Sequence, residues 1–134
     1  MSECTGATTF STDDAHVWGS CGWQLASTEL KIFAQDSNKE VPRAPAFDGS
    51  NIPDEVQGEV CYRGRHIMMG YMANPDLGDE HVATIKKKLD EAIDEFGWLH
   101  SGDKGCLSER GMVKITGRCV GRTYFVHLPW FSGA

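Results

Sequence analysis

An acidic residue, Asp103, ends the segment Ser101-Gly102-Asp103, which follows the apolar residues Trp98 and Leu99. Residues of these types form tight polar turns in which the aspartate accepts hydrogen bonds from backbone N–H groups, and on spacing alone this capped turn is the simpler interpretation. The alternative is functional. A fixed carboxylate offers two acceptor oxygens, which suit two neighbouring hydroxyls of a ribose, as acidic residues do in dinucleotide-binding folds.

Other polar residues have equally plain structural explanations. Glu3 lies near the start of the sequence, and from the residues alone it is best explained as a solvated surface acid. His100 precedes the proposed turn, but the sequence shows no partner for acid–base catalysis, so we expect it to pack as a polar residue. The lysines at positions 86–88 fit a solvated helix face.

The elements that flank Asp103 are a helix before it and a pair of strands after it. Between residues 79 and 96 the apolar positions follow the three-and-four spacing of one helix face, and Gly97 supplies a C-terminal stop. The apolar positions are Val82, Ile85, Leu89, Ala92, Ile93 and Phe96. Residues 104–116, KGCLSERGMVKIT, alternate on both sides of a Gly-containing turn at 108–111, which predicts a β-hairpin.

The first third of the sequence predicts a loop followed by a strand. Residues 1–22 are rich in Ser, Thr, Gly and Asp without sustained periodicity, which is typical of a loop with a short strand in it. Residues 28–34, TELKIFA, alternate, so Leu30, Ile32 and Ala34 share one side of a half-buried strand.

The middle of the sequence predicts a loop and then broken strands. Residues 36–55 hold three prolines among polar residues, a composition that resists helix and central strand and indicates a surface loop. Residues 56–72 carry apolar residues between glycines, which predicts two short strands interrupted at Gly64 and Gly70. Together these elements predict an α+β fold that is rich in β-strands and has one amphipathic helix.

Composition excludes several classes of protein. The 134 residues carry a net charge of −6 without long runs of one sign, so bulk charge favours neither nucleic acid nor anionic lipid. The longest apolar stretches are too short for a membrane span, and the N-terminus has neither a basic patch nor an apolar signal core. We therefore expect an intracellular protein with no transmembrane segment and no nucleic-acid partner.

The five cysteines are odd in number and widely spaced, with neither a CxxC pair nor a nearby histidine at metal-ligand spacing. The aliphatic and aromatic content is sufficient for a core without disulfides. Free thiols are therefore expected, in preference to disulfides or a zinc site.

Four segments in order carry a family resemblance: MSECTG at the start, GEVCYRGRHIMMGYM in the middle, then EAIDEFGWLHSGD, then ITGR. One such motif is weak evidence, but four in this order over residues 1–118 indicate common descent. The chain resembles AMP-forming acyl-CoA synthetases of the adenylate-forming superfamily, nearest to long-chain fatty-acid–CoA ligases of the bubblegum type. Such enzymes use ATP to convert a carboxylate to an acyl-adenylate, release pyrophosphate and pass the acyl group to a thiol.

The resemblance implies roles for four residues. Ser2 matches a hydroxyl residue that touches the adenylate phosphate, and Glu3 matches a carboxylate that helps to hold Mg²⁺. Asp103 matches the carboxylate that bonds the ribose hydroxyls, and Arg118 matches the arginine of ITGR, near the ribose and phosphate. Fatty acid, ATP and CoA are the implied substrates, with AMP and Mg²⁺ bound during the reaction.

Three further residues match the family's GEI…G signature, which is mostly architectural. Gly58, Glu59 and Gly64 are implied to shape a small, distorted β-barrel beside the nucleotide site. The expected fold is therefore part of this β-barrel subdomain, with one amphipathic helix.

The resemblance also implies boundaries. Residues 1–118 would form the C-terminal portion of a large AMP-binding domain, and residues 119–134 a tail outside the family pattern. The family's phosphate loop, acyl-binding region and lysine-bearing C-terminal domain would lie outside this sequence. We therefore expect a fragment of a fatty-acid–CoA ligase that is inactive alone and cytoplasmic, with peripheral membrane association possible for the full-length enzyme. The alternatives are a non-catalytic nucleotide-binding or regulatory module, and a chain that does not fold stably.

Overall fold

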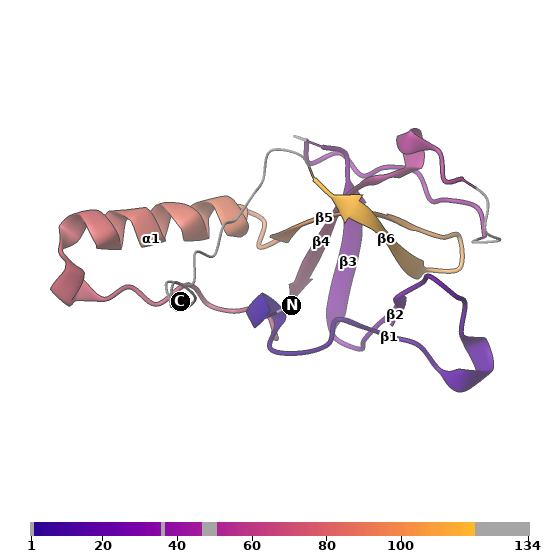
Figure 1. Ribbon diagram of the computed structural model, residues 1–134, viewed down its shortest axis with the longest axis horizontal. Helices are drawn as coiled ribbons and strands as arrows, with labels where there is room; N and C mark the ends of the chain where they lie inside the picture. The colour runs from indigo at the N-terminus through magenta and orange to yellow at the C-terminus, as the bar shows by residue number, and fades with distance from the viewer. Residues whose placement is uncertain (1, 36, 47–50, 120–134) are drawn as a thin grey trace, which may run out of the picture.

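The computed structural model describes residues 2–35, 37–46 and 51–119, which form one curved antiparallel sheet and a projecting helix (Figure 1). The strands are β1 (Thr9–Phe10), β2 (Gly22–Gln24), β3 (Thr28–Phe33), β4 (Gly58–Gly64), β5 (Leu99–Leu107) and β6 (Met112–Arg118). The helix is α1 (Asp79–Ala92), and four 3₁₀ turns are η1 (Ser2–Cys4), η2 (Asp13–Ala15), η3 (Asp54–Val56) and η4 (Pro75–Leu77). The expected β-rich α+β fold with one amphipathic helix is confirmed.

The sheet curls because of its strand order, β1-β2-β6-β5-β4-β3. Only residues 25–27 connect β2 to β3, although three other strands separate them in the sheet. So short a connection requires the second and sixth strands to approach each other, and the sheet closes into a half-barrel. Strands β4 and β5 lie in the middle of this curve, each paired on both sides.

Successive side chains of a strand point to opposite faces, and both faces of the central strands are buried. The main core lies on one face and comprises Cys4, Leu30, Ile32, Val60, Tyr62, Ala92, Leu99, Leu107 and Val113. A smaller cluster of Phe33, Cys61 and Trp98 is built from residues of the other alternation. A fully buried aliphatic side chain contributes about 1.5–3 kcal/mol, so the main core is the principal source of stability.

The predicted hairpin and first strand are confirmed. Strands β5 and β6 are joined by residues 108–111, where the Ser108 hydroxyl accepts a hydrogen bond from the Met112 amide at 3.0 Å. Strand β3 buries Leu30 and Ile32 and exposes Glu29, as the alternation predicted. The short strand expected within residues 1–22 is β1, whereas β2 was not predicted because three residues are too few to show a period.

The helix is shorter than predicted, because it ends at Ala92 and not at Phe96. Asp94 ends it: its Oδ1 accepts hydrogen bonds from the amides of Phe96 and Trp98, both at 2.9 Å. These bonds form a tight turn that carries the chain into β5 and leaves Phe96 59% exposed. Aspartate commonly competes with helical bonding in this way.

The second strand expected between Gly64 and Gly70 is absent from the described residues. After β4 the chain leaves the sheet and packs against η1 instead, where the Met68 amide donates to the Glu3 carbonyl at 2.8 Å. The Thr5 hydroxyl also donates to the His66 carbonyl at 2.9 Å. The expectation failed because this backbone pairs with a segment more than 60 residues away in the sequence.

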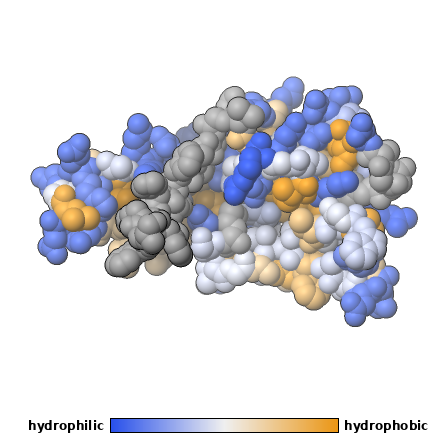
Figure 2. Space-filling view, viewed as in Figure 1, coloured by the Kyte–Doolittle hydropathy of each residue, from blue (hydrophilic) through white to orange (hydrophobic). Residues whose placement is uncertain are grey.

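Apolar side chains also reach the surface. Figure 2 shows hydrophobic side chains among hydrophilic ones over the strand half of the molecule, whereas the helix is largely hydrophilic. Trp18, Met69 and Met72 are 89%, 99% and 95% exposed. None of the helices in the described residues is long and apolar enough to cross a membrane. All five cysteines are free thiols, and only Cys21 is exposed.

Gly58 tests the close approach of β3 and β4. A Cβ atom at this position would lie 2.1 Å from the backbone carbonyl oxygen of Phe33, so a substitution forces the two strands apart. We expect Gly58→Ala to lower the free energy of unfolding by about 1–3 kcal/mol in urea denaturation. Gly117→Ala is the matched control, because a Cβ there meets nothing within 4 Å, and an equal loss in both variants would contradict this explanation.

Tyr62 gives the core a dependence on alkaline pH. Burial raises the pKa of its phenol to about 12, opposed by a hydrogen bond with Thr8 and reinforced by the charges of Cys21, Cys4 and Asp103. The folded state therefore favours the neutral phenol. Its contribution is complete below pH 10 and is lost as the pH rises towards 12.

Between pH 10 and pH 12 we expect the Tyr62 phenol to lower the free energy of unfolding by up to about 3 kcal/mol. Each unit by which the pKa of the folded state exceeds that of the unfolded state corresponds to about 1.4 kcal/mol. Urea denaturation at a series of pH values, compared with Tyr62→Phe, measures this effect. The same decline in both proteins would contradict the assignment to Tyr62.

Candidate functional site

The segment Ser101-Gly102-Asp103 lies inside β5. The expected tight turn between separate elements is therefore wrong. The segment forms a bend within the paired strand. Gly102 has a φ of 72°, in the left-handed region that glycine tolerates best. The pairing of β5 with β4 shifts register between His100 and Lys104, and its pairing with β6 shifts between Lys104 and Gly105. Ser101 fixes the bend, because its hydroxyl donates to the Val60 carbonyl and accepts from the Asp103 amide at 3.1 Å.

The bend places Asp103 directly opposite Arg118 across the β5–β6 pair. Arg118 Nη1 lies 2.9 Å from Asp103 Oδ1, with the two side chains 78% and 31% exposed. An ion pair this exposed contributes about 0–1 kcal/mol, so a ligand with hydroxyl or phosphate groups can compete for either partner. The structure thus brings together two of the four candidate residues.

The other two candidates, Ser2 and Glu3, lie in η1, where the Ser2 hydroxyl donates to Glu3 Oε2 at 3.1 Å. In the described part of the chain, no hydrogen bond or ion pair joins either residue to Asp103 or Arg118. Cys4 of η1, which follows Glu3 directly, packs with Tyr62 in the main core.

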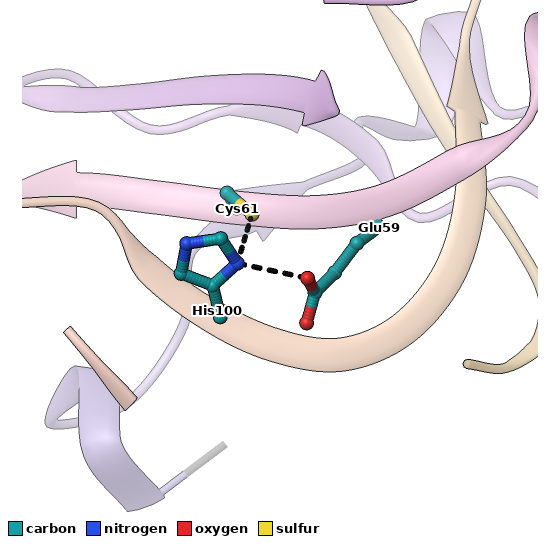
Figure 3. A group of neighbouring side chains, drawn as sticks. All are labelled: Glu59, Cys61 and His100. Carbon is teal, nitrogen blue, oxygen red and sulfur yellow. Dashed lines mark hydrogen bonds and ion pairs between the residues drawn. The ribbon is translucent and has the colours of Figure 1, made fainter. Parts of the chain in front are cut away.

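Behind the bend lies a buried polar cluster that sequence reasoning did not find (Figure 3). His100 Nδ1 lies 2.8 Å from Glu59 Oε2 and 3.4 Å from Cys61 Sγ, and its Nε2 lies 3.3 Å from Asp94 Oδ2. The side chains of Glu59 and His100 are only 6% and 7% exposed. Hydrogen bonds to charged groups contribute about 1.5–3 kcal/mol, and removing one partner leaves the other buried and unsatisfied.

Aromatic side chains seal this cluster from water. The Phe33 ring lies edge-on to Trp98 at 5.5 Å and 6.5 Å from the His100 ring. Over Trp98 lies the Arg63 guanidinium, 4.4 Å from the ring centroid and paired with Glu29 at 2.6 Å. A low-dielectric surrounding of this kind strengthens the polar contacts that it encloses.

The same cluster has the composition of a metal site, because the ligand atoms of Glu59, Cys61 and His100 lie within 4.8 Å of one another. Its present bonding is self-sufficient. Glu59 uses one oxygen for His100 and the other for the Gly102 amide, at 3.0 Å, while Asp94 takes the second imidazole nitrogen. The geometry fits a hydrogen-bonded network whose members satisfy one another.

The expectation that His100 packs as a polar residue fits its burial, but the absence of a partner was wrong. Its partners are Glu59 and Cys61 on the neighbouring strand β4, about 40 residues earlier, and Asp94 in the turn after α1. A spacing rule finds partners within one element and misses pairs between strands. The strand alternation of GEVC and WLHS was the available signal, since it puts Glu59 and Cys61 on one face.

Comparisons with known proteins match most of the chain. A family model described as AMP-binding enzyme matches residues 1–72. The long-chain-fatty-acid–CoA ligase ACSBG2 of Xenopus laevis is 38% identical over 118 residues, which cover 88% of this chain and 12% of that protein. This chain therefore spans only about an eighth of the length of that relative.

Solved structures show the same fold. ATP-bound MatB from Rhodopseudomonas palustris matches with a TM-score of 0.66 and 24% identity, over 88% of this chain and 19% of that chain. The O-succinylbenzoate coenzyme A synthetase MenE from Bacillus subtilis, in complex with AMP, matches with a TM-score of 0.63 and 21% identity, over 88% and 20%. The family model covers 72 of the 134 residues, and the resemblance to AMP-forming acyl-CoA synthetases is confirmed: this chain belongs to the family of AMP-binding enzymes.

Proposed function

We propose that this chain is a fragment of an ATP-dependent fatty-acid–CoA ligase and contributes the contacts to the ribose and to the magnesium side of the nucleotide. The complete reaction joins a fatty acid to ATP as an acyl-adenylate with release of pyrophosphate, and then transfers the acyl group to CoA. The observation that carries the proposal is the placement of Asp103 opposite Arg118 at the bend of β5. The name of the Xenopus laevis relative supports the fatty-acid class of substrate.

Asp103 is suited to bind two vicinal hydroxyls. Its carboxylate is about one-third exposed, and its backbone is held by Ser101, so its oxygens are accessible but their position is defined. Two ribose hydroxyls would each donate to one oxygen, in place of the single weak contact with Arg118. The bent strand thus provides a preorganised acceptor.

Arg118 is suited to the phosphate side. Its guanidinium is mostly exposed and can turn from Asp103 towards the α-phosphate, where it would stabilise the negative charge as pyrophosphate leaves. Ser2 offers a hydroxyl to the same phosphate from η1. These two roles remain proposals based on the family motifs.

Glu3 fits a magnesium contact in its chemistry. Magnesium takes one or two protein carboxylates and completes its coordination with water and phosphate oxygens, and Glu3 has a partly exposed carboxylate bonded only to Ser2 among the described residues. The ion supplies neutralisation of phosphate charge when it is bound.

The domain division also stays a proposal: residues 1–118 as part of a large AMP-binding domain, and residues 119–134 as a tail outside the family pattern. The structure describes only Cys119 of this tail, and its amide donates to the Gly102 carbonyl at 2.9 Å. A cytoplasmic location, with peripheral membrane association of the full-length enzyme, likewise remains a prediction.

A non-catalytic module that binds or senses a nucleotide is the second candidate. The described residues fold around a connected core, which favours a chain able to present the Asp103 bend by itself. The two candidates differ in adenylation and share the ribose contact.

The ribose contact is tested by comparing AMP with 2′,3′-dideoxy-AMP. We expect AMP to bind the purified chain at least about tenfold more tightly, because each hydrogen bond to a charged acceptor contributes about 1.5–3 kcal/mol. Asp103→Asn should remove most of this difference, and Asp90→Asn on the exposed face of α1 should leave it unchanged. NMR titration measures both affinities, and equal binding of the two nucleotides by the unaltered chain would refute the ribose contact.

Adenylation is tested by ATP–pyrophosphate exchange with palmitate and Mg²⁺. We expect no exchange by the isolated chain, because family members use a phosphate loop and a catalytic lysine that its motifs do not include. Exchange above the level without protein would show that the chain is an enzyme in its own right and would overturn the fragment proposal.

A further inference from the structure

We propose that Glu59 and His100 are positioning residues that hold the Gly102 bend in the conformation in which Asp103 meets the ribose. The inference rests on the proposed function, because it explains how the chain presents the ribose contact. It assigns a role to the buried network that includes Glu59, Cys61 and His100 (Figure 3).

Glu59 connects β4 to the bend through both of its carboxylate oxygens. Oε1 accepts the Gly102 amide at 3.0 Å, and Oε2 contacts His100 Nδ1 at 2.8 Å. The first bond fixes the peptide group between Ser101 and Gly102, directly before the φ and ψ bonds of Gly102. Because Gly102 has a left-handed φ, a small rotation at this residue would redirect the Asp103 side chain.

His100 fixes Glu59 in turn. The imidazole lies between Glu59 on one side and Asp94 on the other, in a site that Phe33 helps to cover. Asp94 is itself fixed by the amides of the turn before β5. The ring therefore cannot rotate without breaking contacts on two elements.

The network also couples the two halves of the candidate site. The Gly102 amide is held by Glu59, and the Gly102 carbonyl accepts the amide of Cys119 at 2.9 Å. Cys119 follows Arg118 directly, so one glycine joins the buried network to both members of the Asp103–Arg118 pair. A variant that lacks the Glu59 carboxylate should therefore weaken the ribose contact more than a variant that lowers stability elsewhere in the fold.

A metal ion held by Glu59, Cys61 and His100 is the competing use of the same atoms. Both imidazole nitrogens and both Glu59 oxygens already have partners within the protein, which favours direct hydrogen bonding. Addition of Zn²⁺ or Co²⁺ to the purified chain distinguishes the two. One equivalent of bound metal that is lost in Cys61→Ser would overturn the positioning proposal.

The main test measures Glu59→Ala in the 134-residue chain without and with nucleotide. Without nucleotide we expect the Gly102 amide proton to exchange at least about tenfold faster, because its acceptor is gone. With nucleotide we expect the preference for AMP over 2′,3′-dideoxy-AMP to fall about tenfold, while affinity for the dideoxy nucleotide changes less than twofold. Adding Asp103→Asn to this variant should cause no further loss of preference.

Two further variants separate positioning from stability. Ser108→Ala removes a buried hydroxyl at the other end of the hairpin, so it should lower stability and keep the preference. Glu59→Gln retains an oxygen for the Gly102 amide and should retain part of the preference; it also replaces Glu59→Ala if that variant does not fold. Equal weakening of both nucleotides by the Glu59 variants would overturn the proposal.

The ribose contact and the positioning role of Glu59 can be tested separately. If the unaltered chain shows no preference for AMP, the proposed ribose contact is wrong, whatever the Glu59 variants do. If the chain prefers AMP and a folded Glu59→Ala protein keeps both that preference and the slow Gly102 exchange, the positioning role alone is wrong.

Discussion

One constraint governs this structure: β5 must remain paired with β4 and β6 while it makes a left-handed step at Gly102. A strand that bends in this way loses regular ladder bonds, and buried backbone groups need replacements. Side chains provide them here. Ser101 and Glu59 bond the backbone of the bend, and Cys119 continues the pairing on the other edge. At the surface, the bent strand places Asp103 opposite Arg118.

The two faces of the sheet bury different kinds of side chain. The main core, centred on residues such as Ile32, Val60 and Leu99, supplies apolar burial and closes the half-barrel. The opposite face holds an imidazole and a carboxylate under Phe33 and nearby Trp98. Each of these two groups has partners within the protein, through the contacts of His100 with Glu59 and Asp94 and of Glu59 with the Gly102 amide. Such supporting contacts are what the proposed positioning of Asp103 requires.

The sequence predicted the features that depend on local periodicity. The alternation in TELKIF identified β3, the Gly-containing turn at 108–111 identified the hairpin, and the apolar spacing identified α1. It also singled out Asp103 and Arg118, which the fold places side by side. The order of the four motifs along the chain indicated the family, because that order depends on descent and not on contacts in the fold.

What the sequence did not predict depends on contacts between distant segments. The end of α1 is decided by Asp94, whose partners lie in the following turn, and the segment after β4 pairs with η1 at the start of the chain. Two partners of His100, Glu59 and Cys61, lie 41 and 39 residues before it in the sequence. Such partners follow from strand register, which local patterns do not determine.

The most direct test of the central claim is a crystal structure of the chain with AMP. The expected result has both ribose hydroxyls within hydrogen-bond distance of the Asp103 carboxylate, with the Glu59 contacts to Gly102 and His100 unchanged. AMP bound away from Asp103, or a ribose held there while the Glu59 contacts are broken, would contradict it.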